Sequence, residues 1–147
     1  MTDETPINNW NVVQLYVDAK RKHSWIAVIS LGYTMLEMAL GFLLKSNAGS
    51  SGHPVSSADI EGCRYLIHLA VLAKDRGCLP QPIFDEIDKF NVLRRKAIHK
   101  LLSGTVTPSE LKEAAGMVTP IYGKIQNLHL PSELGPVEKY DPSKHGA

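Results

Sequence analysis

The segment Leu93–His99, LRRKAIH, holds the residues whose types and spacing best fit a chemical role. Arg94 is a permanent cation that can donate several hydrogen bonds to phosphate oxygens. His99, five residues later, carries an imidazole that titrates near neutrality and suits proton transfer. Neither side chain needs a metal ion or an organic cofactor for these roles. These two side chains are therefore the first candidates for chemistry, one as a cation that could hold an anion and the other as a group that could move a proton.

The directions of these side chains depend on the helix predicted over residues 82–104. At about 100° per residue, an apolar stripe forms along this helix. Its members are Ile83, Ile87, Phe90, Ala97 and Leu101. Arg94 falls within about 20° of the centre of the stripe, whereas His99 lies about 140° away, on a side shared with Asn91 and Arg95. A charge on a core-facing stripe is costly unless it is paired.

The natural partner of Arg94 in this sequence is Glu37, the single acidic residue within the apolar segment Trp25–Leu44. Each charge is anomalous on its own helix, so together they predict a buried or half-buried pair. Two interpretations remain open. The pair either fixes the packing of two helices, or it holds Arg94 ready to bind an anion.

The same residues resemble the signature of the HEPN superfamily (higher eukaryotes and prokaryotes nucleotide-binding domains), an arginine followed by four to six residues and a histidine. Arg94 and His99 fit this pattern with four residues between them. The similar context covers about residues 10–130. It comprises a long apolar helix with an acid in YTMLEMAL, the leucine-rich CRYLIHLAVLA, a proline-containing turn, the motif helix and a capped final helix.

The resemblance implies an α-helical bundle that dimerises with the two motif helices facing each other. Many members are metal-independent endoribonucleases of toxin–antitoxin or phage-defence systems, which act beside a protein antitoxin. Others are non-catalytic modules that bind nucleotide, RNA or a protein partner. Carried over to this sequence, Arg94 and His99 would be the catalytic pair. We assign supporting roles to Glu37 and Asn91.

Two positions depart from the pattern of active members. Arg95 stands where many of them have Asn, Asp or His directly after the arginine. Leu101 stands where toxins paired with a minimal nucleotidyltransferase antitoxin often have a tyrosine. The first departure favours the non-catalytic alternative, and the second argues against that antitoxin-paired subclass.

For the catalytic interpretation, the expected reaction is attack of an RNA 2′-hydroxyl on its own phosphate, which leaves a 2′,3′-cyclic phosphate. One helix supplies one histidine, so a two-fold dimer is expected to provide both the acid and the base. Arg95, Lys96 and Lys100 form a basic cluster on the same helix. These cations either contact the RNA backbone or form a solvated face where the helix dipole favours positive charge.

Proline and glycine residues divide the chain into five expected helices, at about 9–20, 24–45, 57–77, 82–104 and from the capping box at Thr107 onward. Pro120 is expected to kink or split the last of these. Trp10, Val13 and Val17 are expected to share one face of the first. The prediction is an all-α antiparallel bundle of about five helices, with a single domain over 1–130 and a loosely ordered tail over 131–147.

The bulk composition narrows the function classes. The 147 residues have 44% hydrophobic content and a formal charge of +1, so any RNA-binding surface must be a local patch. Cys63 and Cys78 form no metal-binding or disulfide pattern, and no two histidines have the spacing of a helical metal pair. We expect reduced thiols, no metal site and a cytoplasmic protein.

The apolar segment Trp25–Leu44 is long enough to span a bilayer, so a membrane anchor is the alternative to a central bundle helix. A carboxylate such as Glu37 inside a spanning helix costs about 2.5–3.5 kcal/mol. The other expected helices are amphipathic and need a central helix to pack against. We therefore expect a buried helix and no membrane partner.

Overall fold

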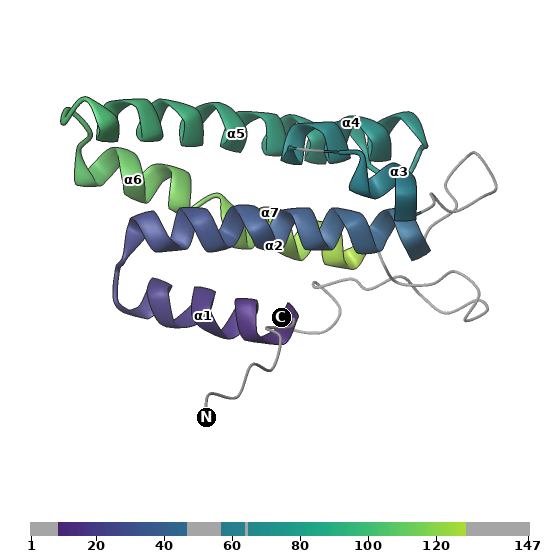
Figure 1. Ribbon diagram of the computed structural model, residues 1–147, viewed down its shortest axis with the longest axis horizontal. Coiled ribbons are helices and arrows are strands. Elements are labelled where there is room, and N and C mark those ends of the chain that lie inside the picture. Colours follow the sequence, from purple (N-terminus) through teal and green to yellow (C-terminus); the bar gives the residue numbers. More distant parts are fainter. Residues whose placement is uncertain (1–8, 47–56, 64, 129–147) are drawn as a thin grey trace.

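The structure, a computed structural model, describes residues 9–46, 57–63 and 65–128. These residues form seven helices and no strand, which confirms the expected all-α bundle (Figure 1). The helices are α1 (Asn9–Arg21), α2 (Trp25–Ser46), α3 (Ser57–Glu61), α4 (Leu66–Asp75), α5 (Gln81–Leu102), α6 (Pro108–Ala115) and α7 (Val118–Asn127). The predicted tail over 131–147 lies outside the described residues.

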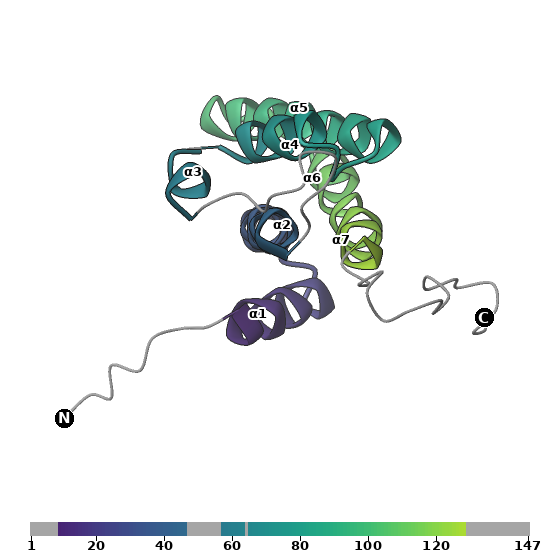
Figure 2. The ribbon, with the colours of Figure 1, turned by 90° about the vertical axis from the view of Figure 1, so that its right-hand side faces the viewer.

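Helix α2 is the centre of the bundle. Seen along the bundle, α1 covers one side of α2, α4 and α5 cover the opposite side, and α6 and α7 flank it (Figure 2). Ten of its residues are buried, among them Leu36, Leu40 and Leu43. Helix α2 is long and apolar enough to cross a membrane, and half of its most apolar stretch is buried in the bundle. Its burial within the bundle matches the expected central role.

The most buried side of α1 is not the side that carries Val13 and Val17. Tyr16 and Ala19 are buried, whereas Val13 is half-buried and Val17 is 46% exposed. The side chain of Trp10 lies outside the described residues. Val13 and Val17 share one side of α1, as expected, but this side is not the most buried one, because two walls, α2 and α7, meet α1 from different directions. Val13 and Val17 point toward the gap between those walls, where a pocket forms.

The expected helix over residues 57–77 is divided in two. Helix α3 ends at Glu61, and α4 begins only at Leu66, after the extended backbone of Tyr65. Gly62 lies at the break, where glycine disfavours a continuous helix. The backbone N–H of Leu66 donates to the Tyr33 hydroxyl at 2.9 Å, so a side chain of α2 caps the start of α4. The predicted boundary failed because this cap comes from another helix.

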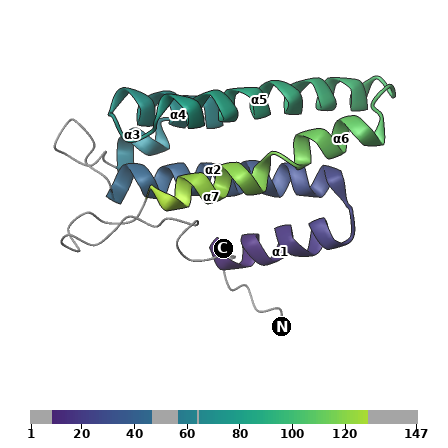
Figure 3. The same ribbon diagram turned by 180° about the vertical axis from the view of Figure 1, so that it is seen from behind.

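The expected last helix is also divided, and here the prediction is confirmed. Helix α6 ends at Ala115 and α7 begins at Val118, two residues before Pro120 (Figure 3). Proline lacks the N–H that would continue the helical ladder. The capping box at the start of α6 is formed, because Thr107 accepts from the Glu110 N–H while the Glu110 carboxylate accepts from the Thr107 N–H.

Three helices end in the same way, with a residue at positive φ closing the last turn. Gly77 ends α4 at φ 77° and Gly104 ends α5 at φ 74°, a conformation that glycine adopts without steric cost. His23 occupies the equivalent position after α1 at φ 56°. There the Ser24 N–H donates to the Ala19 carbonyl at 2.9 Å, as in a Schellman motif. The His23 ring stacks on Trp25, with 5.0 Å between centroids.

Helices α2 and α7 approach each other closely at Gly32. A Cβ atom at this position would lie 2.6 Å from a methyl carbon of Val118, which is itself fully buried. Only glycine leaves room for that side chain. The contact fixes the register between the central helix and the last helix of the bundle.

Candidate functional site

Helix α5 places Arg94 on its core-facing side, as expected. Phe90 and Ala97 are buried one turn before and one turn after Arg94. Arg94 itself is half-buried. The described residues include no fully buried polar or charged side chain, so the guanidinium reaches the boundary between core and solvent.

The guanidinium of Arg94 packs on an aromatic ring. Its Cζ atom lies 4.1 Å from the centroid of the Tyr33 ring, on α2. A guanidinium over a tyrosine face gains cation–π attraction while its N–H groups remain available for other acceptors. Because the hydroxyl of Tyr33 also caps α4 through Leu66, one side chain joins α2, α4 and α5.

Glu37 lies one helical turn after Tyr33 on α2 and is half-buried. Burial raises the pKa of its carboxyl, and the positive charge of Arg94 opposes this rise. No ion pair within 4.0 Å joins Glu37 to Arg94 among the described residues. The predicted pair is therefore not formed as a direct ion pair: Arg94 contacts Tyr33, and its charge acts on Glu37 only through space. We call Tyr33, Glu37 and Arg94 the Arg94 cluster.

His99 faces solvent. Its side chain is exposed and makes no hydrogen bond or ion pair to another residue of the described chain. Because His99 follows Arg94 by five positions on one helix, the two side chains point about 140° apart. The structure therefore places the two residues on different sides of α5 within one protomer. Asn91 is half-buried, two turns before His99.

The three predicted RNA-binding cations differ in their surroundings. Lys100 forms an ion pair with Glu110, the same carboxylate that completes the capping box of α6. The hydrogen bond from Lys100 is the main cause of the lowered pKa of Glu110. Lys100 thus ties α5 to α6. Arg95 and Lys96 are exposed and form no ion pair within the described ranges, so they remain available to a ligand.

Sequence reasoning did not identify the role of Tyr33. The signal was present in the segment YTMLE, where Tyr33 precedes Glu37 by four residues and so shares its side of α2. Among the described residues no group of three or more His, Cys, Asp or Glu side chains is arranged to hold a metal ion.

No family model, curated protein or solved structure matches this chain. The geometry of the chain is therefore the basis of the functional argument. It defines an all-α bundle whose longest amphipathic helix carries a half-buried arginine, an exposed histidine and two free cations.

Proposed function

We propose that this chain is a metal-independent endoribonuclease of the HEPN type, with Arg94 and His99 as its catalytic pair. The observation that carries the proposal is on α5. Arg94 packs on the Tyr33 ring, and within the described chain its N–H donors form no ion pair. His99 is exposed and lies two turns after Asn91 on the same helix. A cation fixed in place and a free imidazole are the two groups that metal-free RNA cleavage requires.

The reaction needs two imidazoles, one to take a proton and one to give a proton. A neutral His99 takes the proton of the 2′-hydroxyl, and the 2′-oxygen forms a bond to phosphorus. The bond from phosphorus to the 5′-oxygen breaks, and a protonated histidine gives its proton to that oxygen. Arg94 stabilises the extra negative charge on the phosphate oxygens. The products are a 2′,3′-cyclic phosphate and a 5′-hydroxyl.

The second imidazole comes from a second copy of the chain. Arg94 and His99 point about 140° apart, so a single α5 cannot direct both at one phosphate. The side of α5 near His99 also carries Val92, which is 40% exposed, and Leu102, which is 81% exposed. Exposed apolar side chains beside a functional residue suit an interface. A homodimer that pairs the two α5 helices brings two arginines and two histidines to one groove.

The biological setting of such an enzyme is a toxin–antitoxin or phage-defence system in the cytoplasm, with a protein antitoxin as partner. Arg95 and Lys96 would contact the RNA backbone, which makes binding weaker as salt rises. Growth arrest on expression of the native chain, relieved by His99→Ala, would support this setting. Normal growth with the native chain expressed as soluble protein would contradict it.

A non-catalytic module that binds nucleotide, RNA or a protein partner is the second candidate. Arg94 favours it, because its packing on Tyr33 is sufficient to explain why a cation lies on the core-facing side of α5. Arg95 favours it too, because it replaces the polar residue that many active members carry.

The test is cleavage of mixed RNA by the full chain in EDTA, beside His99→Ala and Arg94→Lys. His68→Ala is the matched control, since His68 is an exposed histidine of α4 whose ring contacts that of Tyr65. We expect cleavage with cyclic phosphate ends by the native chain and by His68→Ala, and at least a hundredfold loss in the other two. No cleavage by a folded native chain that still binds RNA selects the non-catalytic module. Equal cleavage by all four proteins contradicts the assigned residues.

A further inference from the structure

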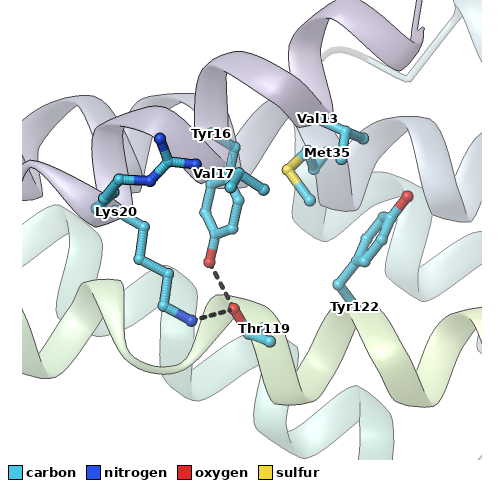
Figure 4. A pocket seen from close by; sticks show the side chains of 8 residues that line it. Val13, Tyr16, Val17, Lys20, Met35, Thr119 and Tyr122 are labelled. Carbon is cyan, nitrogen blue, oxygen red and sulfur yellow. Dashed lines mark hydrogen bonds between the residues drawn. The ribbon is translucent and has the colours of Figure 1, made fainter.

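A pocket of about 460 Å³ lies where α1 crosses α2 and α7. This volume is within the range of about 300–1,000 Å³ of small-molecule sites. Eight of the described residues line it, namely Val13, Tyr16, Val17, Lys20 and Arg21 from α1, Met35 from α2, and Thr119 and Tyr122 from α7. The consecutive helices α1 and α2 and the distant α7 thus build one site (Figure 4).

The walls of the pocket are apolar. Val13, Val17 and Met35 supply aliphatic and thioether surface, and the ring of Tyr122 faces them across the opening (Figure 4). Met35 is 2% exposed and forms the floor, while Val17 is 46% exposed and lies at the mouth. Apolar side chains open to water at a concave site gain free energy when an apolar ligand body covers them.

One end of the pocket is polar and cationic. The Thr119 hydroxyl lies 2.8 Å from the Tyr16 hydroxyl and 3.1 Å from the Lys20 ammonium (Figure 4). Burial raises the pKa of Tyr16, so its hydroxyl stays neutral near pH 7. The Lys20 ammonium carries three N–H donors, and the Thr119 hydroxyl accepts one of them.

The charges at this end are unbalanced. No acidic residue is among the described residues that line the pocket. Within the described chain Lys20 and Arg21 form no ion pair, although the neighbouring Lys22 pairs with Asp18 at 3.1 Å. Two adjacent cations beside an apolar cavity complement a ligand with one negative end and one apolar end.

We propose that this pocket binds a small amphipathic carboxylate, with its apolar body between Val13, Val17 and Met35 and its carboxylate at Lys20, Arg21 and Thr119. The site is separate from the proposed nuclease site. Met35 and Tyr33 are two residues apart on α2, so they point about 200° apart, toward opposite sides of the central helix. Loss of either activity therefore leaves the other testable.

The test uses decanoate as the probe and the full chain with ¹³C-labelled methionine methyl groups. The sequence has four methionines, and only Met35 lines the pocket among those that the structure describes. We expect one saturable site, filled below about 1 mM decanoate, with the largest shift at the Met35 methyl signal. 1-Decanol has the same chain without the charge, and we expect it to bind at least about fivefold more weakly.

Two variants probe the two ends of the pocket. Lys20→Gln with Arg21→Gln should weaken decanoate about tenfold and leave decanol unchanged, because only the charge attraction is lost. Lys45→Gln, an exposed cation of α2 away from the pocket, is the matched control. Val17→Asp should abolish binding of both probes, whereas Val71→Asp should not, since Val71 is 41% exposed on α4. Both aspartate variants replace exposed side chains, and circular dichroism checks that each is folded.

Three results would overturn the proposal. The first is no saturable shift of the Met35 signal up to 1 mM, which is about the upper limit for a specific small-ligand site. The second is equal affinity for decanol, which shows an apolar pocket with no anion site. The third is decanoate binding that survives in the folded Val17→Asp variant, which places the ligand elsewhere.

Discussion

Tyr33 is the residue on which three helices depend. Its hydroxyl caps α4 and its ring supports Arg94 of α5. The sequence identified Arg94 and Glu37 as charges that needed compensation, and they do interact. It did not identify the aromatic contact, because the flat face of a guanidinium is weakly hydrated and packs on a ring at less cost than a buried ion pair. That preference depends on how two helices cross, which local sequence does not specify.

Replacing Tyr33 with Phe should lower the free energy of unfolding by about 1–2 kcal/mol. The ring and its contact with Arg94 remain, but the Leu66 N–H at the start of α4 loses its acceptor. Urea denaturation measures the difference. Tyr65→Phe is the control, because Tyr65 is 57% exposed and its loss of a hydroxyl should cost little. Equal stability of Tyr33→Phe and the native chain would contradict the capping role.

Glu37→Gln should stabilise the protein at neutral pH and have no effect in acid. Burial raises the folded-state pKa of Glu37 above its ordinary value of 4.5, and Arg94 reverses only part of this. The folded state therefore holds the proton more tightly, so stability that is present below pH 4.5 is lost as pH rises through the raised pKa. The unfolding free energies of Glu37→Gln and the native chain should diverge across that range. A difference between the two proteins that does not change with pH would contradict this prediction.

At the scale of elements, helix ends set by local residues were predictable. Gly77 and Gly104 end α4 and α5 at positive φ, and Thr107 with Glu110 begins α6. The start of α4 was not predictable, since its cap comes from α2 and not from a neighbouring residue. The end of α1 was predicted to within one residue, at 20 against Arg21, although His23 occupies a position where glycine is the usual signal.

Gly32→Ala should destabilise the protein by about 1–3 kcal/mol, although alanine is the better helix former. The new methyl group would overlap Val118, whose nearest methyl carbon lies 2.6 Å from the Cβ position, so α2 and α7 must separate. Gly123→Ala on α7 is the matched control. A Cβ there meets no atom within 4 Å, and we expect a gain of about 0.5–1 kcal/mol. Thermal unfolding compares the two, and a gain in both variants would contradict the close contact.

At the scale of the whole molecule, composition predicted the central place of α2, and the apolar stripes predicted most of the core. Ile87, Phe90 and Ala97 are buried on α5 as expected, but Leu101, in the same predicted stripe, is 38% exposed. The pocket was not predictable from Val13 and Val17, because their stripe looks like an ordinary core face. Val13 and Val17 line a pocket because α2 and α7 diverge beneath α1. This arrangement depends on the position of α7, which begins almost 100 residues after α1 ends.

Val92→Glu should weaken the proposed homodimer. Val92 is 40% exposed and lies on the same face of α5 as His99. In a two-fold dimer the two new carboxylates would meet and repel each other. Light scattering at several protein concentrations should show a dissociation constant raised at least about tenfold. Leu15→Glu, which replaces a 49% exposed residue of α1, should leave the dimer intact. A native chain that is monomeric at all concentrations would contradict the composite site.

The central position of α2 has a consequence for synthesis. The ribosome completes α2 at Ser46, but α7, which packs against Gly32, begins 72 residues later at Val118. At about 5–20 residues per second, roughly 4–14 s pass between the two events. During that interval α2, which has the length and composition of a membrane-spanning helix, lacks one of the helices that cover it in the finished bundle. Helix α2 therefore completes its packing only when nearly the whole bundle has been synthesised.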